Sequence, residues 1–150
     1  MFYHLTRSGA DDTLATLIGR ARARDWRVMV RGGDAAHLAR LDEVLWLQPA
    51  DGFLAHGMSG GPMDADQPVL LGSGPVTNGA KVLALIDGAA PDLAEIAALE
   101  RVWVLFDGAD GAAVDAARGL WRSVTDSGHA AQYWTEDGGT WQMKMEKTAV

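Results

Sequence analysis

The spacing of apolar positions predicts an alternation of strands and helices along the chain. Apolar residues that recur every three or four positions predict helices, whereas short apolar runs predict strands. The predicted strands are residues 2–6, 26–31, 68–71, 82–86 and 102–106. The first predicted helix covers residues 12–24, and the second is capped by Asp34 and buries Leu38, Leu41 and Leu45. A short helix is predicted over residues 92–98. A long late helix is marked by the spacing of Val114, Ala117, Trp121 and Val124 and ends at Gly128.

The end of the chain differs from this alternation. Residues 130–135 and 140–145 predict two strands around the turn Asp137-Gly138-Gly139. Residues 48–67 are rich in Pro, Gly, Asp and Ser and predict one long irregular loop. The whole pattern predicts one α/β domain over residues 1–150, with a mostly parallel sheet flanked by helices on both faces and an antiparallel edge.

Composition narrows the classes of protein to consider. The chain has 150 residues, of which 48% are hydrophobic and 22% charged, as in an ordinary globular domain. It has no cysteine, which excludes disulfides, zinc ribbons and thiol catalysis. We see no secretory signal and no apolar run long enough to span a membrane, so we expect a cytoplasmic protein that makes no membrane contact.

The formal net charge of −7 argues against binding nucleic acid over a broad surface. Net charge does not describe local patches, so a small positively charged patch is compatible with a net charge of −7. Direct binding of single-stranded DNA through Trp and Arg residues is therefore kept as a hypothesis that a gel shift would test.

Motifs of catalysis and cofactor binding are weak. The glycine-rich run from Gly72 to Gly79 lacks the spacing of a phosphate-binding loop. The segment Gly57-Met58-Ser59-Gly60-Gly61 matches the letters of a nucleophile elbow, but neither a strand nor a helix is predicted around it. The four histidines are scattered singly. We therefore expect no catalytic residues, no metal and no cofactor. The alternative is an enzyme that binds a nucleotide or small ligand at the carboxyl ends of the strands, which thermal stabilisation by such a ligand would reveal.

Two arrangements suggest binding of another protein. Trp46 and Phe53 lie at a helix exit and in the long loop, where large aromatic residues serve either as core residues or as anchors for a partner. On the late helix, Arg118 and Arg122 lie one turn apart beside Trp121. Two guanidinium groups beside an indole could hold an acidic peptide with an apolar side chain, although Trp121 could also be a core residue beside a solvated arginine pair.

Several segments resemble one known family. They are the opening Phe2-Tyr3-His4-Leu5-Thr6, then Leu41-Asp42-Glu43-Val44-Leu45-Trp46 followed by Phe53-Leu54-Ala55-His56-Gly57, then the helix with Arg118 and Trp121, and Tyr133-Trp134. In this order they are similar to the chi subunit of bacterial DNA polymerase III holoenzyme, over nearly the whole chain.

The resemblance implies a Rossmann-like fold without a working nucleotide site. It implies a non-catalytic accessory subunit of the clamp-loader assembly, which binds the acidic C-terminal tail of single-stranded DNA-binding protein and tethers the replisome to the coated template. By position, Arg118 would take the terminal carboxylate of the tail, with Trp121 and Arg122 shaping the pocket. Trp46 and Phe53 fall where the family meets the psi subunit or its equivalent.

Overall fold

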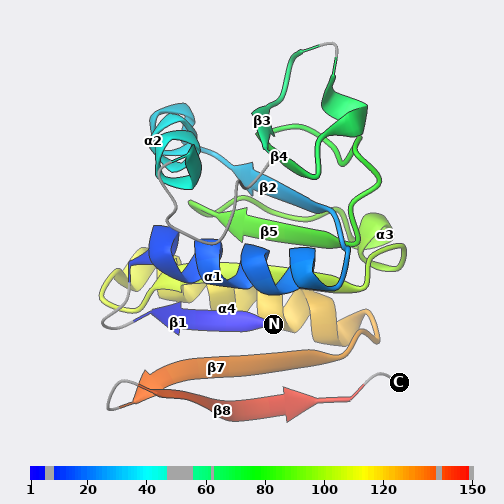
Figure 1. The fold of residues 1–150 in the computed structure, drawn as a ribbon. Coiled ribbons are helices and arrows are strands. Elements are labelled where there is room, and N and C mark those ends of the chain that lie inside the picture. Colours follow the sequence, from blue (N-terminus) through cyan, green and yellow to red (C-terminus); the bar gives the residue numbers. More distant parts are fainter. Residues whose placement is uncertain (6–8, 47–55, 62, 138–139, 149–150) are drawn as a thin grey trace.

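The computed structural model describes residues 1–5, 9–46, 56–61, 63–137 and 140–148 (Figure 1). Its strands are β1 (Phe2–Leu5), β2 (Val28–Gly32), β3 (Gly57–Met58), β4 (Val69–Gly72), β5 (Val82–Ile86), β6 (Arg101–Asp107), β7 (Ala131–Asp137) and β8 (Thr140–Lys147). Its helices are α1 (Ala10–Ala23), α2 (Ala35–Trp46), α3 (Leu93–Ile96) and α4 (Gly111–Asp126), with a 3₁₀ helix η1 (Asp64–Asp66).

The described strands form one eight-stranded sheet in the order β3-β4-β2-β5-β6-β1-β7-β8. Along this order, each strand from β3 through β1 to β7 is parallel to its neighbour, whereas β7 and β8 pair antiparallel at the edge. This arrangement confirms the predicted α/β fold with a mostly parallel sheet and an antiparallel edge. The division of the chain into a single domain stays a prediction.

Helices cover both faces of the sheet. Successive residues of a strand point to opposite faces, so Tyr3 packs with α1 and α2 while Phe2 packs with α3 and α4. In Figure 1, α1 and α2 lie in front of the sheet and α4 lies behind it. All five residues of β5 are buried because both of its faces are covered. Among the described helices, none is long and apolar enough to cross a membrane.

Helix ends follow the capping residues in the sequence. Asp34 Oδ1 accepts hydrogen bonds from the backbone N–H groups of Ala36 and His37 at 3.0 and 3.4 Å, at the start of α2. Gly128 follows the end of α4 with a φ of 85°, a left-handed conformation that glycine adopts without steric cost. These ends confirm the predicted start of α2 and the predicted end of α4.

The prediction of one long irregular loop over residues 48–67, interrupted by an apolar patch around Phe53-Leu54, is wrong in its second half. Gly57–Met58 forms β3, which pairs parallel with β4, and the Ser59 N–H donates to the Leu71 carbonyl oxygen at 2.7 Å. A strand of two residues has no measurable period, and β4 stabilises it by offering free backbone groups at its edge. Residues 47–55 lie outside the described residues.

Candidate functional site

Helix α4 carries the arginine and tryptophan residues that the sequence singled out. Asp110 caps the helix, and its Oδ1 accepts hydrogen bonds from the backbone N–H groups of Ala112 and Ala113 at 3.0 and 3.3 Å. Ala117 and Val124 anchor α4 to the sheet on the face that contains Phe2. Because these residues fix the rotation of the helix, the side chains on its other flanks take defined positions relative to β7.

Trp121 lies half-buried between α4 and the sheet. Its ring packs edge-on against Phe2, with ring centroids 5.4 Å apart, and against Tyr133 of β7, at 6.1 Å. Phe106 lies beside Tyr133 at 5.9 Å and extends this aromatic cluster across β6, β1 and β7. Trp121 is therefore partly a core residue and partly exposed at the surface. Its position is compatible with both roles considered from the sequence, a core residue and part of a surface that binds a peptide.

Arg118 and Arg122 are both exposed on α4, one helical turn apart. Among the described residues, no carboxylate lies within ion-pairing distance of either guanidinium group. Burial raises the pKa of the Tyr133 phenol, and the positive charge of Arg118 acts in the opposite direction.

The Tyr133 hydroxyl group is also joined to β1. It lies 2.7 Å from His4 Nδ1, in a hydrogen bond between side chains. Tyr133 also pairs with Met145 of β8, a residue that is 51% exposed. Residues directly opposite in an antiparallel pair lie on the same face, so Met145 adds apolar surface beside Tyr133. Sequence reasoning did not assign Tyr133 or Met145 to this site, because only the order of strands in the sheet brings β7 and β8 beside α4.

The model of the family "DNA polymerase III chi subunit, HolC" matches residues 1–132 of the 150-residue chain. The chain belongs to the chi subunit family. It is accordingly a DNA polymerase III accessory subunit. No curated protein sequence matches the chain. The match ends in β7, so Tyr133, Trp134 and the whole of β8 lie beyond the part that the chi family model covers.

The second pair of residues singled out in this chi-family chain is only partly described. Trp46 is the last residue of α2, which agrees with its predicted place at a helix exit. Phe53 lies outside the described residues. His56, a neighbour in sequence, is buried, and its Nε2 lies 3.0 Å from Asp42 Oδ1 of α2. The chain after α2 thus returns to contact the same helix.

A crevice lies at the carboxyl ends of the central strands, where open α/β sheets commonly bind ligands. The strands β1 and β6 are neighbours in the sheet, but the helices that follow them pack on opposite faces: α1 follows β1 on one face, and α4 follows β6 on the other. The crevice forms between these two connections. Its volume is about 610 Å³, and its walls include Asp87, Asp107 and Asp110. These carboxylates would repel a phosphate group. Within the described ranges, no three His, Asp or Glu side chains are grouped so as to hold a metal ion.

His37 closes one side of this crevice. Its Nε2 lies 2.6 Å from Asp11 Oδ1 and its Nδ1 lies 2.7 Å from Asp87 Oδ2. Burial lowers the pKa of His37, but the hydrogen bonds and charges of the two aspartates outweigh it, and the net shift is upward. A ring that faces a carboxylate at both nitrogens is best satisfied as the doubly protonated imidazolium. His37 therefore joins α1, α2 and the end of β5.

Proposed function

We propose that this chi-family chain binds the acidic C-terminal tail of single-stranded DNA-binding protein through Arg118, Trp121 and Arg122. In this role it tethers the DNA polymerase III clamp-loader assembly to the coated template. The observation that carries the proposal is the pair of exposed arginines beside a half-buried tryptophan, without a carboxylate partner in the described chain. Family membership supports it independently.

The chemistry of the site fits an acidic peptide that ends in an apolar residue. Arg118 can bind a terminal carboxylate through two parallel N–H···O bonds, a geometry that lysine does not offer. Trp121, Tyr133 and Met145 provide apolar surface next to that charge. The overall charge of −7 leaves this local attraction intact, because screening limits charge interactions to about 10 Å at 0.1 M salt.

A peptide titration tests the proposal. The ligand is a short acidic peptide ending in Asp-Asp-Ile-Pro-Phe, and a second peptide carries a C-terminal amide in place of the carboxylate. We expect dissociation constants of roughly micromolar size for a small site of this kind. Loss of one charge-assisted contact costs about 1.5–3 kcal/mol, so Arg118→Ala should weaken binding about 10- to 100-fold.

Two comparisons make the result specific. Arg40 is an exposed arginine on α2, away from the proposed site, so Arg40→Ala is the matched control and should bind as the wild type does. The amidated peptide should bind the wild type weakly and should lose little more in Arg118→Ala, because the same contact is already missing. Equal affinity of the folded Arg118→Ala variant and the wild type for the acid peptide would reject the proposal.

We further propose that Trp46 and Phe53 contact the psi subunit or its equivalent. The position of Trp46 at the end of α2, next to the following loop, supports this, since loops carry a large share of binding residues. Co-purification with the clamp loader should be lost in the Trp46→Ala and Phe53→Ala variants, while binding of the acidic peptide stays unchanged. Retention of the clamp loader by both variants would reject this second site.

A further inference from the structure

A group of arginines gathers around Trp26, which packs against the core on the α1 face of the sheet. Arg20 and Arg24 lie one helical turn apart near the end of α1, and Arg101 begins β6. The guanidinium carbons of Arg24 and Arg101 lie 5.1 and 5.7 Å from the ring centroid of Trp26. We call Arg20, Arg24, Arg101 and Trp26 the basic strip.

The charges of the basic strip are not neutralised locally. All three arginines are exposed. In the part of the chain that the structure describes, none of them forms an ion pair with a carboxylate, whereas the neighbouring Arg22 lies 3.9 Å from Asp25 Oδ1. The Arg101 guanidinium group donates a hydrogen bond to the Glu100 carbonyl oxygen, at 2.9 Å. A protein with a net charge of −7 thus keeps three cations accessible to an anion from solution.

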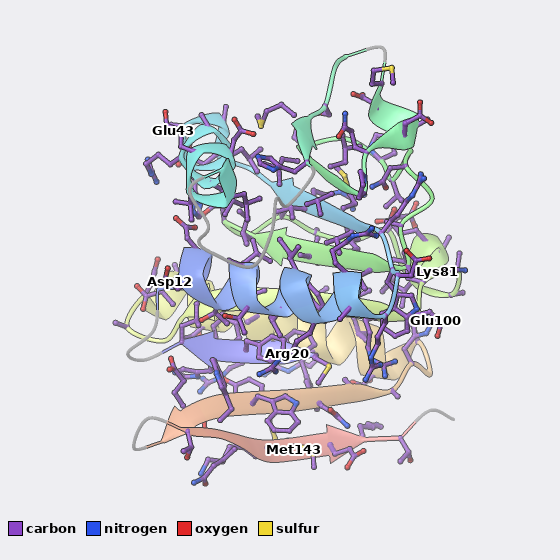
Figure 2. All side chains as sticks on the ribbon, viewed as in Figure 1. Asp12, Arg20, Glu43, Lys81, Glu100 and Met143 are labelled. Carbon is purple, nitrogen blue, oxygen red and sulfur yellow. The ribbon has the colours of Figure 1, made fainter. Side chains whose placement is uncertain are left out.

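An aromatic hollow adjoins the strip. It lies between α1 and the β7–β8 hairpin, has a volume of about 280 Å³, and shares Arg20 with the strip. Its walls include Tyr3, Trp134 and Trp141. Trp141 of β8 packs edge-on against Tyr3 of β1, with ring centroids 5.4 Å apart, so these two strands are in contact across β7. In Figure 2, Arg20 lies on the side of α1 that faces β7.

We propose that the basic strip and the aromatic hollow together bind single-stranded nucleic acid. Phosphate groups would lie on Arg20, Arg24 and Arg101, and one unstacked base would enter the hollow. Binding of single strands commonly combines a positively charged path for the backbone with aromatic side chains that stack on bases. A duplex fits less well, because its bases are paired and stacked and none is free to enter the hollow.

The repeating chemistry favours a nucleic acid over an acidic peptide as the occupant. A polynucleotide carries one phosphate and one planar base in every unit, so it can occupy the arginines and the hollow at the same time in any register. An acidic peptide would need an aromatic residue at one fixed distance from its carboxylates. Trp134 and Trp141 lie beyond residues 1–132, so this surface depends on a hairpin that the chi family model does not cover.

Fluorescence anisotropy with a labelled oligothymidylate of about ten nucleotides, a length within the usual site size, tests this inference. About three phosphate contacts predict a slope of about −2 in a plot of log affinity against log salt, so a tenfold rise in salt should weaken binding about 100-fold. The Arg20→Glu/Arg24→Glu variant should bind at least tenfold more weakly. Trp141→Ala should also weaken binding, and circular dichroism checks that each variant is folded.

Two variants serve as controls. Arg40→Glu reverses one charge on α2, away from the basic strip, and should bind the oligonucleotide much more tightly than Arg20→Glu/Arg24→Glu, which reverses two. Arg118→Ala, which changes the separate site on α4, should bind the oligonucleotide as the wild type does. The inference is overturned if folded wild type fails to bind at low salt, if a duplex of the same length binds equally well, or if Arg20→Glu/Arg24→Glu binds as tightly as Arg40→Glu. It is also overturned if the acidic peptide, but not the oligonucleotide, loses affinity in the double variant.

Discussion

The ion pair between Arg31 and Glu95 should be one of the main supports of the carboxyl end of β2, an interior strand of the sheet. The Arg31 guanidinium group donates to both Glu95 carboxylate oxygens, at 2.6 and 3.2 Å. It also donates to the carbonyl oxygens of Gly74 and Ala90, each at 3.1 Å. One side chain of β2 therefore ties down two loops and α3.

Substitution of Arg31 should lower the free energy of unfolding, because the Glu95 carboxylate and two carbonyl oxygens would lose their hydrogen-bond donor. The side chains of Arg31 and Glu95 are only 11% and 22% exposed, so water replaces the lost hydrogen bonds incompletely. A hydrogen bond to a charged group contributes about 1.5–3 kcal/mol, and part of it is recovered by hydration of Glu95. We expect Arg31→Met to lower the free energy of unfolding by about 3 kcal/mol, which is about 6–12 °C in Tm for a chain of this size.

Glu95→Gln gives the matched comparison. The amide oxygen can still accept the hydrogen bond that the Asp92 N–H donates to Glu95 Oε1 at 2.9 Å, so the cap of α3 is retained. Glu95→Gln removes only the negative charge of the side chain, and we expect it to lower the free energy of unfolding by about 1–2 kcal/mol. The variant Arg31→Met/Glu95→Gln should be less destabilised than the sum of its two changes, with a coupling of about 1–2 kcal/mol.

Urea unfolding of the four proteins measures these free energies. The hydrogen bonds from Arg31, opposed by burial, lower the pKa of Glu95 below its ordinary value of 4.5. A lowered pKa stabilises the fold above the unfolded pKa, and this contribution is lost as pH falls through the folded value. The difference between wild type and Glu95→Gln should therefore shrink below about pH 4.5. Additive effects of the two substitutions, or an unchanged stability of Arg31→Met, would refute this reasoning.

Substitutions at three further positions have expected outcomes. The raised pKa of His37 means that its contribution to stability is complete below its ordinary value of 6.5 and is lost as pH rises through the folded value, so thermal melts of wild type and His37→Gln should converge at alkaline pH. Gly108→Ala would place a Cβ against the His4 ring and 2.9 Å from the Leu5 carbonyl oxygen, so urea unfolding should record a loss of about 1–3 kcal/mol, and an unchanged midpoint would contradict it. Asp110→Ala removes the cap of α4 and should lower the free energy of unfolding by about 1 kcal/mol in the same assay. Asp110→Asn should retain most of this stability, because asparagine also caps helices well.

Most helices and strands could be predicted because their signals are local. The apolar run of β5, the spacing of Leu14 and Ile18 in α1, and the capping residues Asp34 and Asp110 each specify an element from a few neighbouring residues. Trp26 is an instructive exception. It was expected to begin a strand, but β2 begins at Val28, because Trp26 instead packs beside the guanidinium groups of two arginines from different elements.

Some residues of the candidate site could be predicted from the sequence, and others could not. Arg118, Trp121 and Arg122 could be grouped from the sequence, because the helical repeat alone determines which side chains of α4 lie together. Tyr133 and Met145 could not be added to them, since no local pattern states that β7 lies beside β1 or that β8 returns along it. Phe53 lies outside the described residues, and its role stays a prediction.

The sequence by itself therefore determined the alternation of elements, the caps of the helices, the acidic charge and the cationic flank of α4. These depend on interactions between residues a few positions apart, whose geometry the backbone repeat sets. Only the tertiary structure decided that β1 lies between β6 and β7, that His37 stands between two carboxylates, and that Arg101 meets Trp26 beside an aromatic hollow. Those contacts join residues far apart in the chain, and burial of the two faces of one sheet brings them together.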